Sequence, residues 1–248
     1  MFARSRHAAC VPSAPCCALR ILGFLRRSAL CRDSGETRFA LQSRTGILER
    51  SSNEYALGSK GRKEAWCGMA RIGVISDTHG VLPVEAFNAL ADCEHIIHAG
   101  DICSPEIIRN LQTLAPVTAV LGNNDFNEYG TSVCRYARPV IDGVRFLVAH
   151  YPRDVRITFA GSGALAPGDP LPNVCIHGHT HIPEIVVGKE ARPAGLLLCP
   201  GSPTNPRGGF PQCVAKIDVW EGRILRVWVE RTTRGPHCGA VVLRHDFA

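Results

Sequence analysis

Short apolar runs alternate with amphipathic stretches in the middle of the chain. Three runs rich in Ile and Val have the length of buried strands and are residues 71–76, 95–98 and 117–121. Between them, residues 83–91 repeat apolar positions every three or four residues, and Ser104 is placed to cap a second helix that begins at Pro105. This alternation of strand and helix predicts parallel β-α-β units.

The chain from Val140 onward continues with strand signals. Val140-Ile141 and residues 144–149 flank the turn pair Asp142-Gly143, which is typical of a β-hairpin. Residues 151–172 are rich in Pro and Gly and predict a long loop with a short helix near Val155–Phe159. A second, mostly antiparallel sheet is then predicted. Its strands are residues 184–187, 196–199, 213–219 and 225–230.

Three histidines follow the apolar run that begins at Asn173. If this segment stays extended, then His177, His179 and His181 point to one face and repeat about every 6.5 to 7 Å. Neighbouring imidazoles at that spacing reach two metal ions about 3.5 to 4 Å apart. Each histidine alone is equally well a satisfied or solvent-facing side chain. The other strand ends therefore decide whether these histidines bind metal.

The predicted strands all end in polar residues. In open α/β sheets the ligand crevice lies beyond the carboxyl ends of the strands, so these residues are expected at one edge. Together with the histidines, the candidate metal ligands are Asp77, His79, Asp101, Asn123, His150, His179 and His181. Each has a structural alternative as a turn former, helix cap or core histidine. If these structural alternatives held at every strand end, five independent coincidences would be needed at the same edge of one sheet. The set therefore favours a metal site. Carboxylate, imidazole and amide ligands without thiolate suit Mn, Fe, Zn, Ni or Mg.

The order of these motifs resembles that of the calcineurin-like metallophosphoesterases. The motifs are D-T-H (77–79), G-D (100–101), G-N-N-D (122–125), His150 and G-H-T-H (178–181), followed by Pro200-Gly201-Ser202 and Arg207-Gly208-Gly209. The likeness covers about residues 71–230 and is greatest for the small single-domain phosphodiesterases common in bacteria and archaea. It implies an α/β fold, namely a four-layer α-β-β-α sandwich of the metallo-dependent phosphatase type, with mixed sheets and the metal site at the strand ends.

The resemblance also implies a role for each candidate ligand. The ligands of one ion are Asp77, His79 and His181. Those of the other ion are Asn123, His150 and His179, and Asp101 bridges both. Two divalent ions are expected as cofactors, with Mn²⁺ first and Fe, Ni, Zn or Mg as alternatives. A hydroxide held between the ions opposite Asp101 is the expected nucleophile.

Asn124 stands where many members of the wider superfamily have a histidine that contacts the phosphate or protonates the leaving group. An amide donates a hydrogen bond to a phosphoryl oxygen but does not act as an acid. Asp101 and Asn124 are therefore the expected catalytic residues, with Asn124 also binding substrate. Asp125 has no histidine to orient and is assigned no catalytic role. His98 is expected to be structural or to support a ligand, and His177 to support a ligand or to lie at the surface.

The predicted function is hydrolysis of phosphodiester bonds in small molecules. A phosphomonoesterase or a nuclease using the same site is an alternative, although Asn124 weakens the first. A non-catalytic scaffold of the same fold is another alternative, because a retromer coat subunit resembles this fold with altered metal residues. The full ligand set favours an enzyme over the scaffold.

Composition limits the partners. The net charge of +6 comes from residues 1–68, which carry 12 Lys or Arg and 5 Asp or Glu, leaving 16 and 17 for the remainder. No basic patch with interleaved aromatics occurs after residue 68, so neither nucleic acid nor a membrane is expected as a partner, and a homo-oligomer is compatible with the sequence.

The 12 cysteines include no C-x-x-C pair. Cys175, Cys199 and Cys213 lie in apolar runs, which fits a reducing cytoplasm.

Residues 1–68 precede the first predicted strand. They are rich in Arg and poor in acid, which also resembles an organelle transit peptide, while the apolar segment 16–25 is interrupted by Arg20 and too short to span a membrane. We interpret residues 1–68 as a disordered extension or an over-called start, residues 69–232 as the metallophosphoesterase domain and residues 233–248 as an unassigned tail.

Translation from Met69 would place the first strand directly at the start of the protein. We therefore expect N-terminal sequencing of the natural product to find a terminus at or close to Met69. A mature terminus near residue 1 would contradict this prediction.

Overall fold

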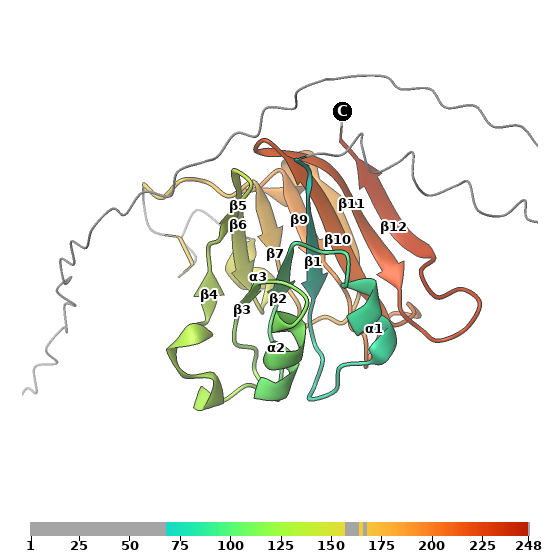
Figure 1. The fold of residues 1–248 in the computed structure, drawn as a ribbon. Coiled ribbons are helices and arrows are strands. Elements are labelled where there is room, and N and C mark those ends of the chain that lie inside the picture. Colours follow the sequence, from blue (N-terminus) through green and yellow to red (C-terminus); the bar gives the residue numbers. More distant parts are fainter. Residues whose placement is uncertain (1–67, 157–163, 166–167, 248) are drawn as a thin grey trace, which may run out of the picture. The chain divides into compact units, whose positions relative to one another are not determined.

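The computed structural model describes residues 68–156, 164–165 and 168–247, and they contain two β-sheets that pack face to face (Figure 1). The first sheet has the strand order β12 (Val241–Asp246), β11 (Arg223–Arg231), β10 (Cys213–Trp220), β1 (Ala70–Ile75), β2 (His95–His98) and β3 (Val117–Ala119). The second has the order β4 (Tyr136–Ala137), β6 (Val144–Ala149), β7 (Val174–Ile176), β9 (Leu196–Cys199) and β8 (Glu184–Val187), with β5 (Val140–Ile141) paired to β6.

Three hydrophobic layers hold this arrangement together. The inner layer joins both sheets and includes Ile72 of β1, Ile217 of β10 and Phe146 of β6. The second layer packs helices α1 (Val84–Ala89) and α2 (Pro105–Gln112) against the outer face of the first sheet (Figure 1). The third lies on the outer face of the second sheet beneath the short helices α3 (Pro152–Val155) and η3 (Gly188–Ala191). The layers confirm the predicted α-β-β-α sandwich, with a thin fourth layer.

The predicted β-α-β units and the hairpin are confirmed. Strands β1, β2 and β3 are parallel, and β5 and β6 are antiparallel around Asp142 and Gly143, whose φ angles are 46° and 77°. Positive φ at both central residues is the requirement of a type I′ turn, whose twist matches that of the strands. Ser104 occupies the N-cap position of α2, but its side chain makes no capping hydrogen bond.

The assignment of all four later strands to the second sheet is wrong for two of them. β8 and β9 do belong to the second sheet, whereas β10 pairs antiparallel with β1, and β11 and β12 extend the first sheet from there. Seven of the eight residues of β10 are buried, which a strand with neighbours on both sides and layers on both faces requires. The second sheet is also less antiparallel than expected, since β6, β7 and β9 are parallel. β12 gives the previously unassigned tail a place at a sheet edge.

Two further expectations concern the loop after β6 and the membrane. The short helix α3 begins at Pro152, earlier than the predicted range Val155–Phe159, of which residues 157–159 lie outside the described residues. Among the described residues, no helix combines the length and the apolar character that crossing a bilayer would need. The apolar segment 16–25 lies outside them.

Candidate metal centre

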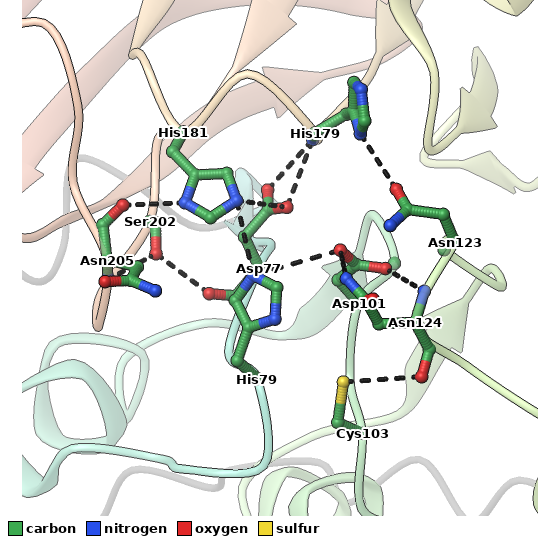
Figure 2. A network of polar contacts seen from close by, with 12 residues as sticks. Asp77, His79, Asp101, Cys103, Asn123, Asn124, His179, His181, Ser202 and Asn205 are labelled. Carbon is green, nitrogen blue, oxygen red and sulfur yellow. Dashed lines mark hydrogen bonds and ion pairs between the residues drawn. The ribbon is translucent and has the colours of Figure 1, made fainter.

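The ends of five strands meet at one edge of the two sheets. β1 leads into Asp77 and His79, β2 into Asp101, and β3 is followed by Asn123. From the second sheet, β6 leads into His150, and β7 leads into the loop of His179 and His181. Figure 2 shows the labelled side chains of these loops directed toward a shared centre. All seven predicted ligands are thereby brought together.

Left-handed backbone conformations aim most of these side chains. Five of the seven predicted ligands have positive φ: Asp77 (54°), His79 (47°), Asp101 (54°), His179 (68°) and His181 (59°). For residues other than glycine this conformation costs roughly 1 kcal/mol or more each and is concentrated at functional sites. The expected extended geometry of residues 177–181 is therefore wrong, because β7 ends at Ile176 and two left-handed residues follow it.

One group of ligand atoms comprises Asp77, His79 and His181, which lie within 4.8 Å of one another. The His181 Nε2 is 3.2 Å from the Asp77 Oδ1 and 3.3 Å from the His79 Nε2. The His181 Nδ1 donates to the Asn205 carbonyl at 2.7 Å, so its Nε2 offers a lone pair. Two ligands about 2.1 Å from a single ion lie about 3.0 to 3.4 Å apart, so this separation fits a divalent ion.

A second group lies around His150. Its Nδ1 donates to the Ala99 carbonyl at 2.8 Å, which leaves its Nε2 as an acceptor in the neutral ring. That Nε2 faces the Asn123 Oδ1 at 3.1 Å and the Asp101 Oδ2 at 3.5 Å. The His179 Nδ1 is 2.9 Å from the same Asn123 oxygen. Acceptors that face each other so closely fit the ligand shell of a cation.

The Asp101 carboxylate lies between the two groups. Its Oδ2 is 3.8 Å from the His79 Nε2, on one side, and 3.5 Å from the His150 Nε2, on the other. Asn124 holds it from outside through two hydrogen bonds, from its backbone N–H to Oδ1 at 2.8 Å and from Nδ2 to Oδ2 at 2.7 Å. The Asp101 carboxylate is thus adjacent to both groups.

Electrostatics keep Asp77 ionised. Burial raises the pKa of this carboxyl, but its contacts with His181, His150 and Ser76 outweigh burial, so its pKa lies below the ordinary value. The backbone N–H of His179 also donates to both Asp77 oxygens, at 3.2 and 3.1 Å. An ionised carboxylate at the contact of the two loops supplies the negative charge that divalent ions require.

The two other histidines near this edge have supporting positions. Burial lowers the pKa of His98 to about 4, so its ring is neutral, accepts from the Gly100 N–H and donates to the Thr78 hydroxyl at 3.0 Å. His177 is fully buried, which contradicts a surface position. Burial disfavours its charged form, yet contacts with Cys199 and Glu184 raise the pKa of His177 to about 10.

Two glycines of the motifs allow the loops to approach closely. A Cβ at Gly122 would overlap the Asp101 carboxylate, and a Cβ at Gly178 would overlap the Ser76 hydroxyl. Any other residue would push the loops of Asp101 and Asn123, or of Asp77 and His179, apart.

Asp125, to which the sequence assigns no catalytic role, turns out to tie two ligand loops together. Its Oδ1 accepts from the backbone N–H groups of Ile102 at 2.9 Å and Cys103 at 2.7 Å, and from the Tyr129 hydroxyl at 3.1 Å. Its Oδ2 accepts from the Gly122 N–H at 2.8 Å. The signal for this role is the tendency of Asp in a turn to accept from nearby backbone N–H groups.

The stretch Pro200–Ser202 provides a second support that sequence reasoning left without a role. The Ser202 hydroxyl donates to the Asp77 carbonyl at 2.8 Å and accepts from the Asn205 N–H at 2.9 Å. The Asn205 carbonyl in turn receives the His181 Nδ1–H. One serine thereby fixes both the loop of Asp77 and the orientation of the His181 ring.

Comparisons with known proteins agree with this geometry. A family model described as the calcineurin-like phosphoesterase superfamily domain matches residues 70–222. The "Probable metallophosphoesterase" of Methanothermobacter thermautotrophicus is 42% identical over 156 residues, which are 59% of this chain and 86% of that protein.

Solved structures show the same fold. Yfce, a phosphoesterase from E. coli, has a TM-score of 0.51 at 20% identity, over 72% of this chain and 100% of that chain. Vps29 from Entamoeba histolytica complexed with Zn²⁺ has a TM-score of 0.53 at 19% identity, over 72% and 99%. These likenesses confirm the architecture expected from the sequence.

The Asp125 contacts predict a loss of metal affinity without a loss of fold. In Asp125→Asn, an NH₂ group replaces an oxygen that accepts backbone N–H bonds, so the loops of Asp101 and Asn123 should shift apart. We expect Mn²⁺ binding, measured by calorimetric titration, to weaken about 10- to 100-fold, as for other partners that support ligands. Asp142→Asn is the matched control, because the Asp142 Oδ2 accepts a backbone N–H in a turn remote from the site. Equal metal affinity in both variants would contradict the prediction.

Proposed function

The chain belongs to the calcineurin-like phosphoesterase superfamily, and from this premise we propose that it hydrolyses phosphodiester bonds of small molecules with two divalent metal ions. The observation that carries the proposal is the convergence of acceptor atoms at the strand ends. Two groups of ligands, sharing Asp77, lie within 4.8 Å, and partners outside each group fix the rings of His150 and His181 with Nε2 facing inward.

The first proposed ligand set is one of these groups, and the second extends from His150 through the Asn123 Oδ1, which faces both His150 and His179. One ion would be held by Asp77, His79 and His181, the other by Asn123, His150 and His179, and Asp101 would bridge them. When bound, the ions supply a water of lowered pKa and neutralise charge on the phosphoryl oxygens. We propose Mn²⁺, with Fe, Ni, Zn or Mg as alternatives, because the set contains oxygen and imidazole donors. The nearby Cys103 thiol contacts the Asn124 carbonyl at 3.6 Å instead.

Asn124 has two tasks in this proposal. One N–H of its Nδ2 donates a hydrogen bond to Asp101, and this bond would hold the bridging carboxylate in place. The second proton of the same group is available for a phosphoryl oxygen, because an amide nitrogen carries two donors. No step gives a proton from Asn124 to the leaving group. The enzyme therefore depends on leaving groups that depart as anions.

A different feature of the protein argues against each alternative function. A phosphomonoesterase needs help for a poor leaving group, which Asn124 does not give. A scaffold has no need for seven converging ligands, five of them on strained backbone. A nuclease needs a basic surface that the composition after residue 68 does not favour.

We further propose a small phosphoester as the substrate and the cytoplasm as the location. A reducing cytoplasm suits the seven free cysteines among the described residues.

Loss of the bridging carboxylate tests the proposed role of the metals. We expect the wild type to hold close to two ions per chain by mass spectrometry and to cleave bis(4-nitrophenyl) phosphate with added Mn²⁺. Asp101→Asn should lower kcat by more than about 100-fold, since even supporting partners of a metal cost 10- to 100-fold. Asp246→Asn, in the exposed β12, should leave activity unchanged. A wild type that is metal-free and inactive would favour the scaffold.

The absence of an acid at residue 124 predicts a steep dependence on the leaving group. Across a series of aryl and alkyl phosphodiesters, kcat/KM should fall as the leaving-group pKa rises. Asn124→His should raise the relative rate for the alkyl esters about tenfold or more, because a general acid contributes about 10²- to 10⁴-fold. Comparable wild-type rates for alkyl monoesters and aryl diesters would show that the reasoning is wrong.

A further inference from the structure

Tyr151 directly follows His150, and its ring lies against the rings of two candidate ligands. The centroids of the Tyr151 and His179 rings are 4.6 Å apart with the planes tilted by 59°, and those of Tyr151 and His150 are 5.4 Å apart in an edge-to-face arrangement. The His150 and His179 rings also meet edge to face, at 5.2 Å. The three rings therefore form one cluster, at separations that favour aromatic packing.

The local sequence fixes the place of Tyr151. A proline disfavours helical backbone in the residue before it, and Tyr151, which precedes Pro152, has the extended angles φ −85° and ψ 136° at the N-cap of α3. The helix is anchored by Val155, which is fully buried in the third hydrophobic layer. The guanidinium carbon of Arg153, also in α3, lies over the Tyr151 ring at 4.5 Å from its centroid. This cation–π contact further restricts the orientation of the ring.

Two of the four candidate ligand histidines are oriented by backbone carbonyls. The Ala99 carbonyl accepts from the His150 Nδ1 at 2.8 Å, and the Asn205 carbonyl accepts from the His181 Nδ1 at 2.7 Å. A ring that is held at one nitrogen presents the other nitrogen to a metal in a fixed direction.

No backbone carbonyl holds the His79 or the His179 ring within the described part of the chain. The His79 ring packs on the His181 ring at 5.0 Å, and the latter is already fixed. The His179 Nδ1 faces the Asn123 Oδ1 at 2.9 Å, but Asn123 is itself a proposed ligand of the same ion. Tyr151 thus supplies a ring contact that reaches His179 from outside the ligand set.

We propose that Tyr151 is a positioning residue for the second ion, because its packing orients the His179 ring as a hydrogen bond orients the His150 ring. This role rests on the proposed function, which assigns His150 and His179 to the same ion. The described ring contacts of Tyr151 reach both histidines of that ion and neither histidine of the other. Loss of the Tyr151 ring should therefore weaken the binding of one ion selectively, which a general loss of stability would not do.

The affinity for each ion tests this role in the absence of any substrate. Equilibrium dialysis of the full chain against increasing Mn²⁺, with bound metal counted by mass spectrometry, measures both affinities. In Tyr151→Ala we expect one ion to bind within about twofold of the wild type and the other to bind about tenfold or more weakly, since one aromatic pair contributes up to about that factor and Tyr151 makes two. Tyr151→Phe keeps the ring and should bind both ions within about twofold of the wild type.

Phe247→Ala is the matched control. The Phe247 ring packs edge to face on the His245 ring at 4.6 Å, at the end of the edge strand β12, and neither residue is a proposed ligand. This variant loses the same kind of contact and should bind both ions as the wild type does.

A further variant covers the case in which Tyr151→Ala does not fold. Tyr151→Leu fills part of the same volume without a planar ring and should show the same selective loss of one ion. Wild-type affinity for both ions in the folded Ala or Leu variant, or an equal loss for both ions, would overturn the role of Tyr151.

The proposed function and the role of Tyr151 fail in different ways. A wild type that binds two ions but cleaves no phosphodiester would refute the proposed hydrolysis, and dialysis would still measure the selective loss in Tyr151→Ala. Normal cleavage of bis(4-nitrophenyl) phosphate by the wild type, together with unchanged metal affinity in Tyr151→Ala, would refute only the role of Tyr151.

Discussion

Atoms that all offer lone pairs face one another across the strand ends, and the surrounding structure is arranged to hold them there. The His79 and His181 Nε2 atoms are 3.3 Å apart, and the His150 Nε2 is 3.1 Å from the Asn123 Oδ1. Such contacts are unfavourable between neutral acceptors, and divalent ions turn them into ligand bonds. Five left-handed residues add backbone strain at the same place. Metal binding is therefore expected to relieve an arrangement that folding imposes.

Hydrogen bonds from residues that adjoin the ligands offset the unfavourable acceptor contacts and the backbone strain. Asp125 gathers backbone N–H groups from the loops that follow β2 and β3, and Ser202 joins the loop of Asp77 to that of His181. Gly122 and Gly178 remove the side chains that would separate these loops. Each support connects two loops from different strands, so a change in one moves at least two ligands.

The sequence predicts the features of this protein that depend on local pattern. The β-α-β alternation, the Asp142-Gly143 hairpin and the residues that follow each strand are all read from periodicity and turn chemistry. The partner of each strand is not predicted by local pattern. An apolar run such as that of β10 is compatible with either sheet, and its pairing with β1 in the first sheet depends on the tertiary arrangement. Backbone conformation is not predicted either, since no sequence pattern shows that His179 and His181 adopt the left-handed backbone conformation. The contacts of Asp125 depend on loops about 20 residues apart in the chain.

The ligands lie outside all three hydrophobic layers, which has a consequence for how this fold changes function. None of the seven predicted ligands belongs to the clusters of Ile72, Leu90 or Leu147 that hold the sheets and helices together. Replacing a ligand leaves these clusters intact, although Asp77, Asp101, His150 and His181 are themselves buried, and at a left-handed position it relieves backbone strain only when the new residue is glycine. The scaffold is free to keep its stability while the loops gain, alter or lose metal ligands. Under the proposed function, activity depends on the loop residues, and a residue such as Asn124, which adjoins the ligands without joining them, would set which phosphoester is used.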